Sequence, residues 1–173
     1  DLSEVLAGGS DQQQMLLFDL LGQERMVVAL SAVDRLEMIA AAKIDRRGSD
    51  AVVLYGDKIM KLIPLANYVE GAVHKGLFGD ETLPVIVHYH NGFPIGLIVK
   101  KVHNIVTVPS QSVMITQPQR GILGSVIVNE TVMSILNIEV VLKLSGLNVS
   151  SDTAYAEEPD LPRNNALLAQ EGQ

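Results

Sequence analysis

Two histidines lie two residues apart, at His88 and His90. In an extended strand this spacing places both imidazoles on one face, where a pair of ring nitrogens could chelate zinc or copper. No Asp or Glu nearby offers an obvious third ligand, and a solvent-facing stripe beside the Asn91-Gly92 turn explains the pair equally well. A small β-barrel metal-binding domain or enzyme using these histidines is therefore an alternative with little support, and no cofactor is expected.

Other residue patterns that could support catalysis are incomplete. The stretch 121–125, Gly-Ile-Leu-Gly-Ser, is similar to a phosphate-binding loop, but it lacks the Gly-Lys-Ser/Thr ending and leads into a predicted strand instead of a helix. The chain has no cysteine, which excludes disulfides, thiolate metal sites and thiol nucleophiles. The paired carboxylates Glu157 and Glu158 lie in a polar segment that nothing would desolvate. We therefore expect no catalytic site in this chain.

The acidic excess lies at the two ends of the chain. Of 173 residues, 13 are Lys or Arg and 20 are Asp or Glu, which gives a formal net charge of -7. Residues 1–13 and 151–173 carry all of this excess, while the residues between them hold equal numbers of acidic and basic side chains. A neutral body with acidic ends lacks the basic stripe of a nucleic-acid-binding protein. No nucleic-acid partner is therefore expected.

No stretch is typical of a membrane segment or a targeting signal. The apolar runs are shorter than the ~18–20 residues that a membrane helix needs, and no cationic region followed by an apolar run opens the chain. Hydrophobic residues make up 47%, as in an ordinary globular domain. These features predict a cytoplasmic domain that does not insert into the membrane. Because the first residue is Asp1, we expect a piece of a longer chain.

Four β-hairpins are predicted between residues 15 and 136. In each, two apolar runs flank a short turn that contains Gly or Asn, which is a strong local signal for a hairpin. The paired runs are 15–21 with 25–30, 51–55 with 58–63, 83–90 with 93–99, and 121–128 with 131–136. One extra strand in each half, at 34–39 and 102–108, then favours an all-β fold of two small five-stranded barrels.

Helices are expected to be short. Pro64 could start a turn or two of helix that ends near Val69, and Asn137 could cap a helix that ends near Gly146. Residues 70–81 show no strand pattern and are predicted to connect two halves. The predicted organisation is a linker or helix end over 1–14, a first barrel over about 15–75, a second barrel over about 80–136, a C-terminal helix over about 137–145, and an acidic flexible tail or linker over 146–173.

The order of segments from residue 15 to residue 144 resembles a CheW-like domain, the module of chemotaxis coupling proteins and of the C-terminal regulatory part of the CheA histidine kinase. The resemblance is spread over residues 17–20, 28–37, 52–65, 83–87, 95–99, 102, 121–127 and 135–138. Residues 30–37 and 121–127 are more similar to the regulatory domain of CheA than to a free-standing coupling protein. Gly56-Asp57 stands where the family often has Arg-Gly, and Lys61 stands where it often has Pro. The difference at Gly56-Asp57 favours the regulatory domain of the kinase over a free-standing coupling protein.

The resemblance implies two packed SH3-like five-stranded β-barrels with short helices, in a non-catalytic regulatory domain of a chemotaxis-type two-component histidine kinase. Such a domain binds the CheW-type coupling protein and the cytoplasmic tip of a chemoreceptor, next to the rest of the kinase and within membrane-bound receptor arrays. A free-standing CheW-type coupling protein is the alternative. The residues that the resemblance implies for partner binding are Val33, Leu36, Ile39, Ile98 and Val99.

Overall fold

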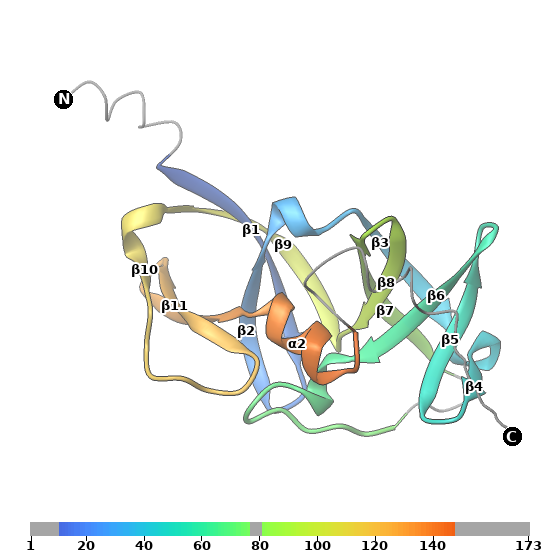
Figure 1. The fold of residues 1–173 in the computed structure, drawn as a ribbon. Coiled ribbons are helices and arrows are strands. Elements are labelled where there is room, and N and C mark those ends of the chain that lie inside the picture. The colour runs from blue at the N-terminus through green and yellow to red at the C-terminus, as the bar shows by residue number, and fades with distance from the viewer. Residues whose placement is uncertain (1–10, 77–80, 148–173) are drawn as a thin grey trace, which may run out of the picture.

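The computed structural model describes residues 11–76 and 81–147, which form strands, short 3-10 turns and the α-helix α2 (Figure 1). The strands are β1 (Gln12–Leu20), β2 (Gln23–Ala29), β3 (Arg35–Ala40), β4 (Asp45–Arg47), β5 (Asp50–Tyr55), β6 (Lys58–Pro64), β7 (Thr82–His90), β8 (Phe93–Ile98), β9 (Lys101–Pro109), β10 (Val113–Met114), β11 (Ile122–Val128) and β12 (Thr131–Leu136). The helical segments are η1 (Leu30–Ala32), η2 (Ala41–Lys43), η3 (Leu65–Asn67), η4 (Ser110–Ser112) and α2 (Ile138–Leu144).

All four predicted hairpins form, as β1–β2, β5–β6, β7–β8 and β11–β12. The turn of β7–β8 has left-handed backbone at both central residues, with φ of 53° at Asn91 and 83° at Gly92. The turn of β11–β12 is similar, with φ of 51° at Asn129 and 64° at Glu130. Such turns match the right-handed twist of the strands that they join. The local turn signals therefore determine these hairpins directly.

The strands form two six-stranded sheets, which confirms the predicted all-β class with two packed β units. The first sheet has the order β10-β11-β12-β2-β1-β9, and the second has the order β3-β7-β8-β6-β5-β4. Each sheet has one strand more than the five expected because a very short strand, β10 or β4, joins one end of it. Figure 1 shows β10, β11 and β2 on one side of the molecule and β4, β5 and β6 on the other.

The two sheets do not follow the predicted division of the chain into consecutive halves. The hairpin β1–β2, expected with β3–β6, pairs instead with β9 and β12 of the first sheet. The hairpin β7–β8 pairs with β3 and β6 of the second sheet. Each half of the chain thus contributes its first hairpin to the other sheet. Turn residues specify only strands that are adjacent in sequence, whereas β2–β12 and β6–β8 are parallel pairings between distant strands and carry no local signature.

This exchange makes the two halves structural repeats of one another. β1–β6 and β7–β12 each consist of a hairpin, a longer strand, a 3-10 turn, a short strand and a second hairpin. Corresponding strands also occupy corresponding places in the two sheets. The segment from β3 to η2 corresponds to the segment from β9 to η4, so equivalent residues in the two segments are always the same number of positions apart. Equivalent pairs include Val33 and Val102, Leu36 and Ile105, and Ile39 and Val108.

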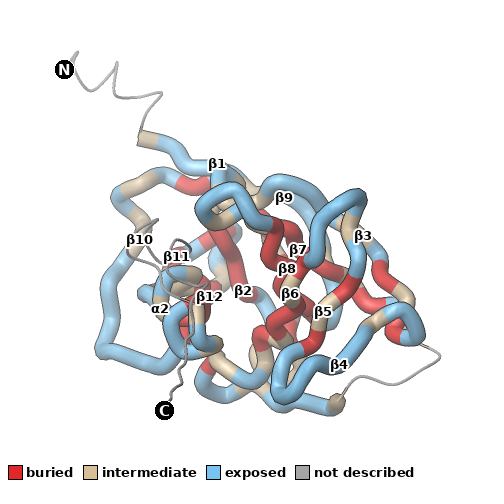
Figure 2. Tube along the Cα trace, turned by 45° about the vertical axis from the view of Figure 1, so that its right-hand side comes forward, coloured by how far each residue is buried: buried red, intermediate tan, exposed pale blue. Residues whose placement is uncertain are grey.

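Apolar side chains form a core within each sheet unit and a third core between the two sheets. The core between the sheets includes Phe18, Met26, Ile86 and Leu97, all with 0% exposure. Complete burial of one such side chain contributes about 1.5–3 kcal/mol. Figure 2 shows the buried segments gathered along β2, β6, β7 and β8, with mostly exposed residues along β4. The middle core therefore fixes the position of one sheet against the other.

The C-terminal helix covers part of this junction. α2 follows Asn137, whose side-chain oxygen accepts a hydrogen bond from the backbone N–H of Val140 at 3.2 Å. Its residues Val141 and Leu142 are buried in the middle core. Where the sequence indicated helix from Pro64 onward, the structure has the short 3-10 turn η3. No helix among the described residues is long and apolar enough to cross a membrane.

The segments at the two ends of the chain are described only in part. Residues 12–14, predicted as linker, belong to β1 because their backbone pairs with residues 107–109 at the end of β9. The predictions for residues 1–10 and for the tail from residue 148 onward lie outside the described residues.

Candidate protein-interaction site

An apolar groove lies between the outer strands of the two sheets, β3 and β9. These strands stand at the ends of their sheets, and each pairs with one neighbour only among the described residues. Leu36 and Met38 of β3 are 46% and 63% exposed, although they are large and apolar. Contiguous exposed apolar side chains at such a place are typical of a binding surface. The groove, called here the β3–β9 groove, is lined by Leu36, Glu37, Met38, Pro84, Lys100, Lys101 and Val102.

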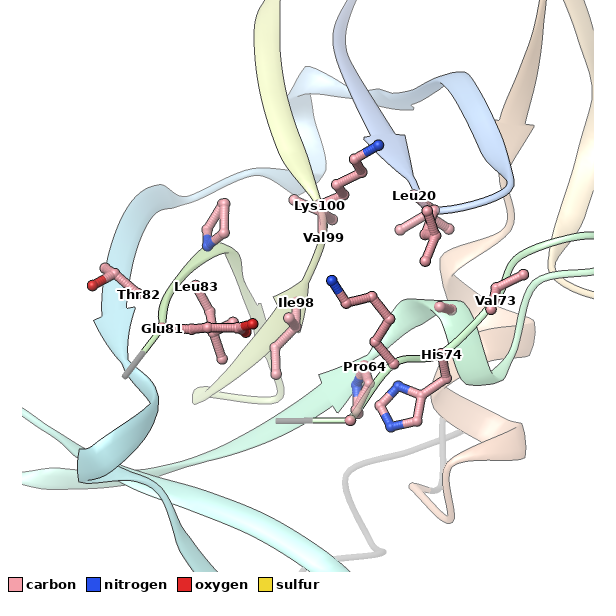
Figure 3. Close-up of a pocket in the computed structure, with 15 residues that line it drawn as sticks. Leu20, Pro64, Val73, His74, Glu81, Thr82, Leu83, Ile98, Val99 and Lys100 are labelled. Carbon is pink, nitrogen blue, oxygen red and sulfur yellow. The ribbon is translucent and has the colours of Figure 1, made fainter. Parts of the chain in front are cut away.

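A second cavity, of about 310 Å³, adjoins the β3–β9 groove and shares Pro84 and Lys100 with it. Figure 3 shows Leu83 and Ile98 on one side of this cavity and Pro64 and His74 on another. Residues of both sheets line this cavity, and its walls are mainly apolar. The cavity therefore lies at the junction of the two sheets, next to the groove. The structure thus offers one connected apolar region where the two sheets meet.

The five residues implied by the family resemblance fall into two groups. Leu36 is exposed in the β3–β9 groove, and Val33 is half-buried just before β3, packed against the middle core. Ile39, Ile98 and Val99 are buried, with 9%, 8% and 4% exposure. Ile98 and Val99 also line the cavity of Figure 3. The structure therefore brings Leu36 to an accessible surface, while the three buried residues support that surface from the core.

Sequence reasoning did not single out the other apolar residues of this region. Met38 and Val102 line the β3–β9 groove together with Leu36. Ile105, further along β9, is 48% exposed. The alternation of apolar residues at Leu36 and Met38 was visible in the sequence, but only the exchange of hairpins brings β9 to the opposite wall.

Two exposed aliphatic pairs form a further apolar feature on the hairpins. Leu54 lies opposite Ile59 across β5–β6, and Ile127 lies opposite Val132 across β11–β12. Their exposed fractions range from 50% to 73%. The two pairs occupy equivalent positions in the two repeats, next to the hairpin turns. Each sheet therefore presents the same kind of aliphatic patch, and we call these the hairpin pairs.

A hydrogen bond fixes the side chain of Glu37 on β3. The hydroxyl of Tyr55 donates to Oε2 of Glu37 at 2.8 Å. Burial and this hydrogen bond to a carboxylate, together with the carboxylate's charge, raise the pKa of Tyr55 to about 12. The bond connects β5 to the outer strand β3.

The two histidines considered first lie on β7 with their rings stacked, 6.5 Å apart between centroids. Nδ1 of His88 lies 2.9 Å from the carbonyl oxygen of Ala32, a contact that connects β7 to η1. Across residues 11–76 and 81–147, no three His, Asp or Glu side chains are grouped closely enough to hold a metal ion. The arrangement gives His88 a structural contact with η1.

The glycines of the stretch 121–125 have a packing role. Gly121 has φ of 78°, and a Cβ there would collide with the carbonyl oxygen of Tyr68. A Cβ at Gly124 would likewise collide with the carbonyl oxygen of Met114 on the neighbouring strand β10. These glycines allow close approach of backbone to β11, as expected for a bend in a barrel strand.

Comparisons with known proteins agree with this architecture. The family model described as CheW-like domain matches residues 14–145. The fold is similar to that in the crystal structure of the scaffolding protein TtCheW from Thermoanaerobacter tengcongensis, with a TM-score of 0.61 and 16% sequence identity over 75% of this chain and 87% of that one. No curated protein sequence matches the chain. Because the family model spans most of its length, the chain belongs to the CheW-like domain family.

Proposed function

We propose that this chain is the regulatory CheW-like domain of a chemotaxis-type histidine kinase, which binds a coupling protein and the cytoplasmic tip of a chemoreceptor. In this role it works by assembly at receptor arrays in the cytoplasm and performs no catalysis itself. The observation that carries the proposal is the β3–β9 groove, where Leu36, Met38 and Val102 form an accessible apolar surface at the junction of the two sheets.

The shape of the groove fits a helix of a receptor coiled coil. The groove has a volume of about 370 Å³ and an apolar floor flanked by charged side chains. An amphipathic helix inserts side chains at spacings of three or four residues into such a groove. Leu36 and Met38 protrude from one wall and would pack between those anchors.

The hairpin pairs fit the second partner. Leu54 with Ile59 and Ile127 with Val132 are flat aliphatic patches on strands, which suit the face of another β-barrel better than a helix. The hairpin pairs lie on β5, β6, β11 and β12, whereas the groove lies between β3 and β9. A coupling protein and a receptor helix could therefore bind at the same time.

Titration of the 173-residue chain with the two candidate partners from the same genome tests the proposal. The double variant Leu36→Asp/Met38→Asp is expected to weaken receptor-fragment binding at least tenfold and to leave coupling-protein binding unchanged, because a carboxylate in an apolar contact is costly. Leu54→Asp/Ile59→Asp is expected to do the reverse. Ile115→Asp, at a residue that is 72% exposed elsewhere, serves as the control.

Unaltered receptor binding by the groove variant, or no detectable binding of either partner by the unchanged chain at hundreds of micromolar, would contradict the proposal. A gene that encodes an ATP-binding domain upstream of Asp1 supports the kinase assignment. A start codon close upstream would instead identify a free-standing coupling protein.

A further inference from the structure

We propose that the β3–β9 groove is directional, and that Lys100 and Lys101 at one end of it bind acidic side chains of the partner helix. The helix would then lie along the groove in one direction only. This inference rests on the proposed function, because it concerns the same groove and a helical partner.

The apolar walls of the groove are only partly alike in the two directions. The groove lies between equivalent strands of the two repeats, and some of the apolar residues along these strands are equivalent, but Met38 on β3 corresponds to the polar Thr107 on β9. Val33 corresponds to Val102, and Leu36, with 46% exposure, corresponds to Ile105, with 48% exposure. A helix turned end to end would therefore meet similar valine and leucine or isoleucine side chains, but it would meet Thr107 in place of Met38.

The polar residues at the two ends of the groove differ strongly. Lys100, at one end, corresponds in the repeat to Ser31, and Lys101 corresponds to Ala32. The pocket beside Ser31 is lined by uncharged residues, namely Gln12, Gln13, Gln14, Ala29, Leu30 and Ser31. The lysine end therefore offers two cations that the equivalent positions, Ser31 and Ala32, lack.

The charges of these lysines are not neutralised by ion pairs within the described residues. Lys100 and Lys101 are both exposed, and the ion pairs of the described chain join Lys61 to Asp50 and His103 to Asp19.

Two carboxylates lie near this end, and both already have partners. Glu37 accepts the hydrogen bond of Tyr55, and Asp19 interacts with His103, with Lys100 adding a weaker attraction. The guanidinium of Arg35, also on β3, adds a further positive charge near Tyr55 and Glu37. Because both carboxylates already have partners, the two lysines at this end are complementary to an acidic segment of a partner.

Binding of a chemoreceptor tip fragment from the same genome, with acidic residues on its docking helix, provides the test. We expect Lys100→Glu/Lys101→Glu to weaken binding by roughly tenfold at low salt, because each exposed pair contributes modestly and reversal adds repulsion. The difference should shrink severalfold near 1 M salt, where the Debye length falls to about 3 Å. The matched control is Lys43→Glu/Arg47→Glu, which reverses two exposed charges around β4.

Direction is measured with a spin label at the tip of the receptor fragment. In the unchanged chain the label should broaden amide signals at one end of the groove only, near either Met38 or Gln14. The exchange variant Lys100→Ser/Ser31→Lys swaps equivalent residues and should extend the broadening to the opposite end.

Equal affinity for the lysine variant and its control at low salt, or broadening at both ends in the unchanged chain, would overturn the inference. If Leu36→Asp/Met38→Asp binds the fragment normally, the proposed function itself fails. Loss of binding in that variant with no effect of the lysines leaves the proposed function in place and removes only the directionality.

Discussion

Asp19 connects three segments of the molecule through a single residue. Its Oδ1 accepts a hydrogen bond from the backbone N–H of Arg25 at 3.0 Å, and its Oδ2 lies 2.7 Å from Nε2 of His103 on β9. Its carbonyl oxygen accepts from the N–H of Lys100 at 2.9 Å. Burial acts to raise the pKa of Asp19. It is outweighed by the hydrogen bond from Arg25, by the hydrogen bond and charge of His103, and by the charge of Lys100. The pKa of Asp19 therefore lies below 3.8.

We expect Asp19→Asn to lower the free energy of unfolding at pH 7 by about 1–2 kcal/mol, since charge-assisted hydrogen bonds are lost. A carboxyl group whose pKa is lowered by folding stabilises the protein above its unfolded pKa, and this contribution disappears as the pH falls through the folded pKa. The two proteins should therefore converge in stability between pH 4 and pH 2, as measured by urea unfolding. Glu24→Gln, an exposed neighbour on β2, is the control. An equal difference at pH 7 and pH 2 would contradict this account of Asp19.

Hairpins are the elements that could be predicted from the sequence, because their turns need residues that tolerate positive φ. The partner-binding residues were harder to predict for a physical reason that β8 illustrates. Five of its six residues are buried, since one face contacts the core of the second sheet through Ile98 and the other contacts the middle core through Leu97. A strand covered on both faces shows no alternation, so its pattern does not indicate which residue borders a groove.

The turn of β11–β12 retains a local conflict that can be removed. Glu130 has φ of 64°, a conformation that costs a non-glycine residue about 1–2 kcal/mol. We expect Glu130→Gly to raise the free energy of unfolding by about 0.5–1 kcal/mol, after allowing for the greater freedom of glycine in the unfolded chain. The reciprocal variant Gly92→Glu, at a turn of the same type with φ of 83°, should lower it. Thermal unfolding measures both, and a melting temperature reduced by Glu130→Gly would refute the argument.

At the scale of the whole molecule, the exchanged hairpins make the two halves of the chain depend on one another. The sequence indicated two barrels but placed them in consecutive halves, because turn signals say nothing about pairing between distant strands. In the structure the outer strand β3 needs β7 from the other half, and β9 needs β1. The middle core also takes residues from both halves, including Phe18 and Ile63 from one and Leu97 and Leu136 from the other. Neither half therefore contains a complete sheet or a complete core.

This dependence predicts the behaviour of a chain cut in the connection between η3 and β7. Each fragment alone should lack a cooperative unfolding transition, because its first hairpin has lost the strands with which it pairs, and two further strands, β3 and β6 or β9 and β12, have each lost a sheet neighbour. An equimolar mixture should recover the dispersed amide spectrum of the intact chain and one cooperative transition, since the missing strands come from the partner fragment. Two consecutive barrels would behave in the opposite way, because each half would fold alone and mixing would add nothing. Cooperative unfolding of either isolated fragment would thus contradict the exchange of hairpins between the two sheets.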